Sequence, residues 1–160
     1  ARPVAGWWRR VRTGEKRLRM ALAAVFYFGA AGAFIELLLL EHFEESIQYA
    51  PFAALLLSVA ALGWALARPA PRSLRAARWA SLLLAVVGVV GILLHFRSNV
   101  LFEVEMDPET AGVALLWLAL RGATPALAPG MLVQLGLVGF LFTFGHPALG
   151  RDAPSRGDDS

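Results

Sequence analysis

The sequence predicts an all-α integral membrane protein, a polytopic bundle of four transmembrane helices with one short interfacial or re-entrant helix. Of its 160 residues, 58% are apolar and only 17% are charged, whereas soluble domains carry about 25% charged residues. The apolar residues gather in runs that reach the roughly 18 residues expected of a helix that spans a bilayer. Most lysines and arginines lie outside these runs, as is typical of membrane proteins with a fixed orientation.

Three spans follow directly from hydropathy, at about residues 20–40, 47–67 and 79–96. Between the second and third lies a basic connector in which Pro69 and Pro71 end the helix, because proline has no backbone N–H to donate. With a fourth span, these helices define a transmembrane bundle over 20–148. A basic segment, 1–19, precedes the bundle, and a polar tail, 149–160, follows it and is expected to be disordered.

A short helix is predicted at about 108–120, before the last span. Asp107 followed by Pro108 is typical of a helix start, and Arg121-Gly122 is typical of a helix stop. Such a helix covers about 20 Å, less than the hydrocarbon core of about 30 Å, so we expect it in the outer interface or as one limb of a re-entrant hairpin. The alternation of side chains over 100–106 predicts a short extended segment before it.

The fourth span is predicted at about 131–148, after a break at 122–130 that is rich in proline and glycine. Broken helices line ligand sites in some transporters. A plain connector at the interface needs no such site, and we favour the connector. Gly88 in the third span and Gly136 in the fourth favour close packing of helices through small residues.

The charge distribution predicts the orientation. Seven of the fifteen lysines and arginines lie before Met20, and four more lie in the connector between the second and third spans. The opposite loops hold acids instead, from Glu41 to Glu45 and from Glu103 to Glu109. The positive-inside rule therefore predicts a cytoplasmic N-terminus in the cell membrane, the inner membrane of a bacterium, with the acidic loops on the outer side. The C-terminus is cytoplasmic if the short helix does not cross.

The same basic segments indicate which partners to expect. Lysine and arginine beside membrane spans favour contact with anionic lipid headgroups, and Trp7, Trp8 and Trp79 lie where interfacial aromatic anchors are expected. No nucleic-acid motif accompanies the basic residues, so we expect no binding to nucleic acid. The lack of cysteine excludes disulfides and thiolate metal sites.

Glu36 is an acid inside the first predicted span. A carboxyl group at that depth needs a proton, a partner or a cavity. The simpler interpretation is a protonated Glu36 that donates a hydrogen bond to a neighbouring helix. The alternative is a relay for protons or cations.

Two histidines are predicted to lie at the same outer level, His42 after the first span and His95 at the end of the third. With the acids Glu45, Glu103 and Glu105 they are candidate ligands of a divalent transition metal, and the two imidazoles could instead bind a haem. His42 and Glu45 would share a helix face if the first helix continued past them. The ordinary interpretation is that both histidines are interfacial residues bonded to carbonyls or water, since no HExxH or other tight ligand motif is present.

Three classes of function follow. We favour an accessory or interaction subunit of a larger membrane assembly, bound to other membrane subunits or to further copies of itself, because the chain is small and carries no catalytic motif. The second class is a metal- or haem-binding membrane protein that uses the outer histidines and acids. The third is a transporter or channel component that uses Glu36. An enzyme is the less favoured interpretation.

Overall fold

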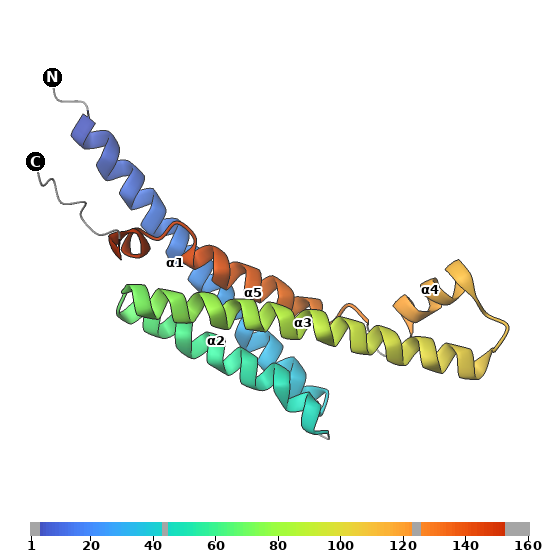
Figure 1. Cartoon of the computed structure of the whole chain (residues 1–160). Helices are drawn as coiled ribbons and strands as arrows, with labels where there is room; N and C mark the ends of the chain where they lie inside the picture. The colour runs from blue at the N-terminus through green and yellow to red at the C-terminus, as the bar shows by residue number, and fades with distance from the viewer. Residues whose placement is uncertain (1–3, 43–44, 123–125, 153–160) are drawn as a thin grey trace, which may run out of the picture.

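The computed structural model describes residues 4–42, 45–122 and 126–152, with the side chains of 13–42, 45–122 and 126–150. In this part of the chain the structure is all-α, with five α-helices, α1 to α5, and two short 3-10 helices, η1 and η2 (Figure 1). Three apolar stretches are long enough to cross a membrane: Thr13–Leu39, Ser46–Ala67 and Pro71–Met106. The second and third predicted spans fall inside them, and the first, 20–40, extends one residue beyond Leu39. The chain is therefore an integral membrane protein.

The first two spans are α1 (Val4–Leu39) and α2 (Tyr49–Ala67), joined through η1 (Ser46–Gln48). Most of the predicted basic segment belongs to α1, so it is a helical extension of the first span. The helix stops after Leu39, and Glu41 turns the chain with a positive φ of 50°. His42 and Glu45 therefore do not share a helix face.

The third span is α3 (Pro71–Met106), one continuous helix of 36 residues and about 54 Å. It begins at Pro71, well before the predicted span at 79–96, so most of the predicted connector is helical. The Ser73 hydroxyl accepts a hydrogen bond from the N–H of Ala70 at 3.1 Å. The prediction of an extended segment over 100–106 is wrong, because these residues continue the helix. The alternating window is short, and its leucine, glutamate and methionine residues are good helix formers.

The predicted short helix is α4 (Gly112–Arg121), which begins later than the expected start at 108. Asp107 is the C-cap of α3 instead, and its carboxylate accepts hydrogen bonds from the Glu109 N–H at 3.2 Å and the Thr110 hydroxyl at 2.6 Å. Aspartate forms such turns as readily as it begins helices. The predicted stop is confirmed, since α4 ends at Arg121 with Gly122 as its C-cap.

The last apolar helix is α5 (Gly130–Thr143), which is shorter than the span predicted at 131–148. Beyond it the chain turns at Gly145, which has a positive φ of 58°, and continues into η2 (Pro147–Asp152). Leu149 in η2 packs against the core. The remainder of the tail expected to be disordered, 153–160, lies outside the described residues.

The bundle is organised around α3, which packs against α2 on one side and α5 on the other (Figure 1). A Cβ atom added at Gly88 would lie 2.7 Å from the Val133 nitrogen, and one at Gly136 would lie 2.6 Å from the Ser81 oxygen. These glycines let the backbones of α3 and α5 touch, as the sequence predicted. Phe26 from α1 is fully buried and extends the core to the first helix.

Candidate functional site

His42 lies in the turn that follows α1, opposite His95 on α3. Its backbone N–H donates a hydrogen bond to the Leu37 carbonyl at 3.0 Å, which ties the turn to the end of the helix. Both histidine side chains are half-buried. Their ring centroids are 6.2 Å apart, and the ring planes are inclined by 52°. The fold therefore brings together the two histidines that the sequence placed at one level.

The surroundings of His42 favour its neutral form. Burial lowers the pKa of His42, and the neighbouring His95 lowers it further, because two positive charges at this distance repel each other. A neutral imidazole has one nitrogen that is not protonated and can accept a hydrogen bond or bind a metal ion. His42 is therefore able to act as a ligand at neutral pH.

The acids that we predicted as further ligands lie apart from one another. Glu45 is exposed at the start of η1, while Glu103 and Glu105 lie on α3 about 12 and 15 Å beyond His95 along the helix axis. Within the ranges that the structure describes, no three His, Asp or Glu side chains come close enough to hold one metal ion. The histidine pair is the part of the predicted ligand set that the fold assembles.

Glu36 lies on α1 inside the first apolar stretch, with its side chain exposed at the surface of the bundle. An exposed side chain does not face a neighbouring helix, so the expected hydrogen bond from Glu36 is not formed among the described residues. A hydrogen bond between α1 and α2 comes from Tyr27 instead, whose hydroxyl donates to the Val59 carbonyl at 3.2 Å.

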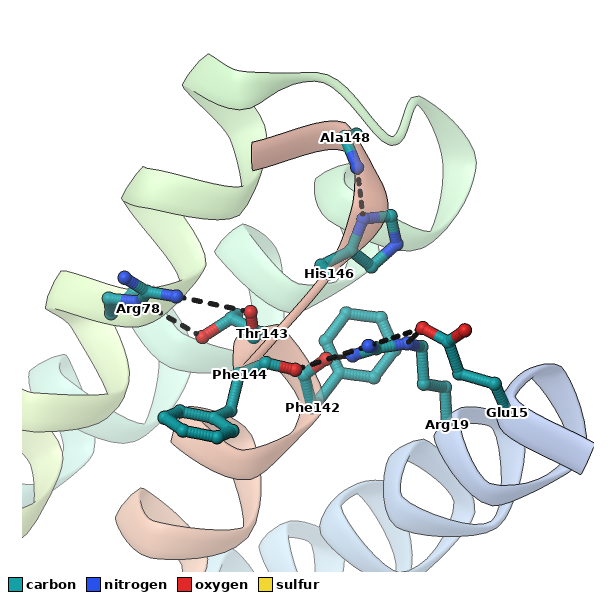
Figure 2. Close-up of polar contacts among 8 residues, drawn as sticks. All are labelled: Glu15, Arg19, Arg78, Phe142, Thr143, Phe144, His146 and Ala148. Atoms are coloured by element: carbon teal, nitrogen blue, oxygen red, sulfur yellow. Dashed lines mark hydrogen bonds and ion pairs between the residues drawn. The ribbon is translucent and has the colours of Figure 1, made fainter. Parts of the chain in front are cut away.

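A second polar cluster lies where α5 ends (Figure 2), at the end of the bundle away from the turn that follows α1 (Figure 1). The last carbonyls of a helix have no N–H partner within the helix itself. Arg19 from α1 donates hydrogen bonds to the carbonyl of Phe142 and, at 3.1 Å, to that of Phe144. The same guanidinium forms an ion pair with Glu15 at 2.7 Å. Arg19 thus fastens α1 to the end of α5.

Arg78 from α3 reaches the same helix end. Its Nε donates a hydrogen bond to Thr143 Oγ1 at 3.2 Å, and a terminal nitrogen donates to the Thr143 carbonyl at 3.1 Å. The guanidinium also lies over the ring of Phe140, 5.6 Å from its centroid. Both arginines point at the end of α5 in Figure 2. We call Glu15, Arg19, Arg78 and Thr143 the arginine cluster.

His146 lies beside the arginine cluster, and its Nδ1 accepts a hydrogen bond from the Ala148 N–H at 3.1 Å. Burial and the charge of Arg19 lower the pKa of His146, while Glu15 acts in the opposite direction. In the part of the chain that is described, every buried side-chain nitrogen and oxygen has a hydrogen-bond partner. The arginine cluster is therefore a structural joint, which we missed because we used these arginines only to predict orientation.

Beyond the histidine pair, α3 continues into an arm, which we define as residues 97–121 (Figure 1). The amide of Asn99, which is 2% exposed, donates a hydrogen bond to the Ala119 carbonyl at 2.8 Å and fixes α4 to α3. Ala119 is the buried residue of α4. Val113 and Trp117 on the same helix are 82% and 57% exposed. The contact of α4 with α3 is therefore thin, and most of its apolar surface faces outward.

The fold and these sites define a small helical membrane protein with a packed bundle, a projecting arm and a pair of histidines at the base of that arm. No protein-family model matches the chain, and no curated protein or solved structure matches it either. The function is therefore inferred from the geometry of the chain itself.

Proposed function

We propose that this protein is an accessory subunit of a membrane assembly and holds a partner protein on its arm. The observation that carries the proposal is the apolar surface of the arm. Its exposed large apolar side chains are Leu101, Phe102, Val104, Met106, Val113, Leu116, Trp117, Leu118 and Leu120. Full burial of one such side chain contributes about 1.5–3 kcal/mol, so even partial cover by a partner supplies substantial binding energy.

Charge supports a protein rather than lipid as the cover of this surface. The arm also carries four acids, Glu103, Glu105, Asp107 and Glu109, and carboxylates are costly inside hydrocarbon. We therefore put the arm at or beyond the membrane surface, where a large apolar patch marks an interaction site. The partner that fits presents an apolar helix face edged by lysine or arginine, which complements the acids.

The proposal includes a topology. The basic half of α1 and the connector between α2 and α3 are cytoplasmic, the arm is on the outer side, and α5 returns the chain across the membrane as a short fourth span. Because the chain has no cysteine, single cysteines can report on this arrangement. A membrane-impermeant maleimide should label Val113→Cys in intact cells, and Arg72→Cys only after lysis. The reverse pattern would contradict the orientation.

The partner is tested with a photo-crosslinking amino acid at Val113 of the full chain in its native membrane. Phe28, which is 85% exposed on α1 within the first apolar stretch, is the matched control. We expect Val113 to crosslink to one protein that copurifies at a fixed ratio, and Phe28 to crosslink to lipid. A Trp117→Glu variant should lose that protein without losing expression.

Two results would overturn this function. Lipid adducts alone at Val113, as at Phe28, would mean that the arm lies in the bilayer. A product of twice the mass of the chain would identify a second copy as the occupant, and the protein would then be a homo-oligomer rather than a subunit for another protein.

A further inference from the structure

The histidine pair offers a chemistry that the interaction role does not use. An ion about 2.0–2.1 Å from an imidazole nitrogen lies about 3.2 Å from the centre of that ring, so two imidazoles on one ion have ring centres roughly 5–6.4 Å apart. The centroids of His42 and His95 are 6.2 Å apart. This separation is near the upper, almost linear limit of the range, so a tetrahedral ion requires the two rings to approach each other by roughly 1 Å.

We propose that His42 and His95 together bind one divalent transition-metal ion of the zinc or copper type at the base of the arm. Imidazole suits these ions. The two residues come from different elements, a turn and a helix, so a shared ion would join the end of α1 to α3 at this point. The proposal is independent of any partner on the arm.

Several features of the site support a metal ligand role for the pair. His95 is on a continuous helix, and the backbone of His42 is bonded to the end of α1, so neither ligand depends on a long loop. Glu41 and Glu45, exposed on either side of His42 in the sequence, add negative charge nearby.

Two histidines fill half of a tetrahedral coordination shell. The remaining positions are open to water. An open shell of this kind also predicts moderate rather than very tight affinity, since closed structural sites have four protein ligands.

The test uses the full chain in detergent, purified with a tag that contains no histidine and treated with a chelator before titration. The probes are Zn²⁺ by calorimetry and Cu²⁺ by electron paramagnetic resonance, which reveals the nitrogen atoms bound to copper. The variants are His42→Ala and His95→Ala. His146→Ala is the matched control, because His146 is the third histidine of the chain and lies after the end of α5, beside the arginine cluster.

We expect one ion per chain in the wild type, a copper spectrum with two imidazole nitrogens, and affinity lower by about 100-fold or more in each variant at the pair. His146→Ala should bind like the wild type. The copper spectrum of the wild type tests the proposal even if a variant fails to fold.

Three outcomes would overturn the metal site. One is wild-type affinity in His42→Ala or His95→Ala. Another is a copper spectrum with no nitrogen ligands, or an equal loss of binding in His146→Ala. The third is a haem absorption band in the native protein that disappears in both pair variants, since the pair would then hold a haem rather than a metal ion.

Discussion

Two regions of the molecule are built on α3, namely its interface with α5 and the arm. They use the helix differently. Between α3 and α5, glycines let the backbones touch, and Arg19 and Arg78 occupy the last carbonyls of α5. In the arm, Asn99 fixes α4 to α3, and many large apolar side chains face outward. The interface between α3 and α5 stabilises the fold, while the arm leaves apolar side chains exposed. Mutations should therefore affect stability in one region and binding in the other.

The largest effect is expected from Gly136→Val. A Cβ atom at this position would meet the Ser81 oxygen at 2.6 Å and the Ala85 nitrogen at 2.7 Å, both of them backbone atoms that cannot move aside. We expect a loss of at least about 3 kcal/mol in unfolding free energy, at or above the usual cost of overpacking. Thermal unfolding in detergent measures it. Gly32→Val is the control, because nothing lies within 4 Å of its Cβ position; equal losses would contradict the close packing of α5.

A smaller loss is expected from Arg78→Ala. The substitution removes the hydrogen bonds to Thr143 Oγ1 and to the Thr143 carbonyl, at a net cost of about 0.5–1.5 kcal/mol each. The carbonyl keeps its hydrogen bond from the His146 N–H at 3.3 Å. Chemical unfolding, followed by circular dichroism, measures the change. Arg72→Ala on the same helix removes an exposed arginine and should stay within about 0.5 kcal/mol. If both variants were equally stable, the arginine cluster would not be a structural joint.

A local effect is expected from Asn99→Ala. Loss of the hydrogen bond to the Ala119 carbonyl should weaken the attachment of α4 by about 1 kcal/mol, without unfolding the bundle. Hydrogen exchange read by mass spectrometry should show faster exchange in α4 and unchanged exchange in α2. The exposed neighbour Ser98, changed to alanine, is the control. Faster exchange throughout the protein would mean that the arm is part of the cooperative core.

The smallest effect is expected from acidification. Burial and His95 lower the pKa of His42, so as pH falls through the ordinary histidine pKa of about 6.5 the unfolded chain gains its proton first. The stability from this group is complete above about pH 6.5 and is lost below it. His146 acts in the same direction. The midpoint of thermal unfolding should fall between about pH 7.5 and pH 5.5, and less so in His42→Gln. A higher midpoint at the acidic pH would contradict this.

Hydropathy was enough to find the long helices, because a membrane span is fixed by the length of an apolar run and needs no knowledge of its neighbours. The proline connector correctly predicted the end of α2, but α3 begins at Pro71 rather than near residue 79 as predicted. The local sequence was a poorer guide at Asp107. Aspartate is common at helix starts, but here it caps the end of α3. The sequence could not separate these two uses, since both depend on the same carboxylate accepting nearby backbone and hydroxyl hydrogens.

The candidate sites show the same limit. His42 and His95 could be paired in advance because topology alone brings the ends of two spans to one level. Glu103 and Glu105 were grouped with them by nearness in the sequence, but a continuous helix carries them away at 1.5 Å per residue. The contacts of Arg19 with the end of α5 join residues more than a hundred positions apart, and no local pattern predicts such a contact.

The shortness of α5 has a consequence for the bilayer around it. Its 14 residues cover about 21 Å, whereas a typical hydrocarbon core is about 30 Å thick. In the proposed topology α5 crosses the membrane, so on its lipid-facing side the membrane has to become thinner, or headgroups and water have to reach inward toward the guanidinium groups at the end of the helix. In that topology the protein imposes an uneven thickness on its surroundings, and a thin membrane accommodates it at lower cost than a thick one.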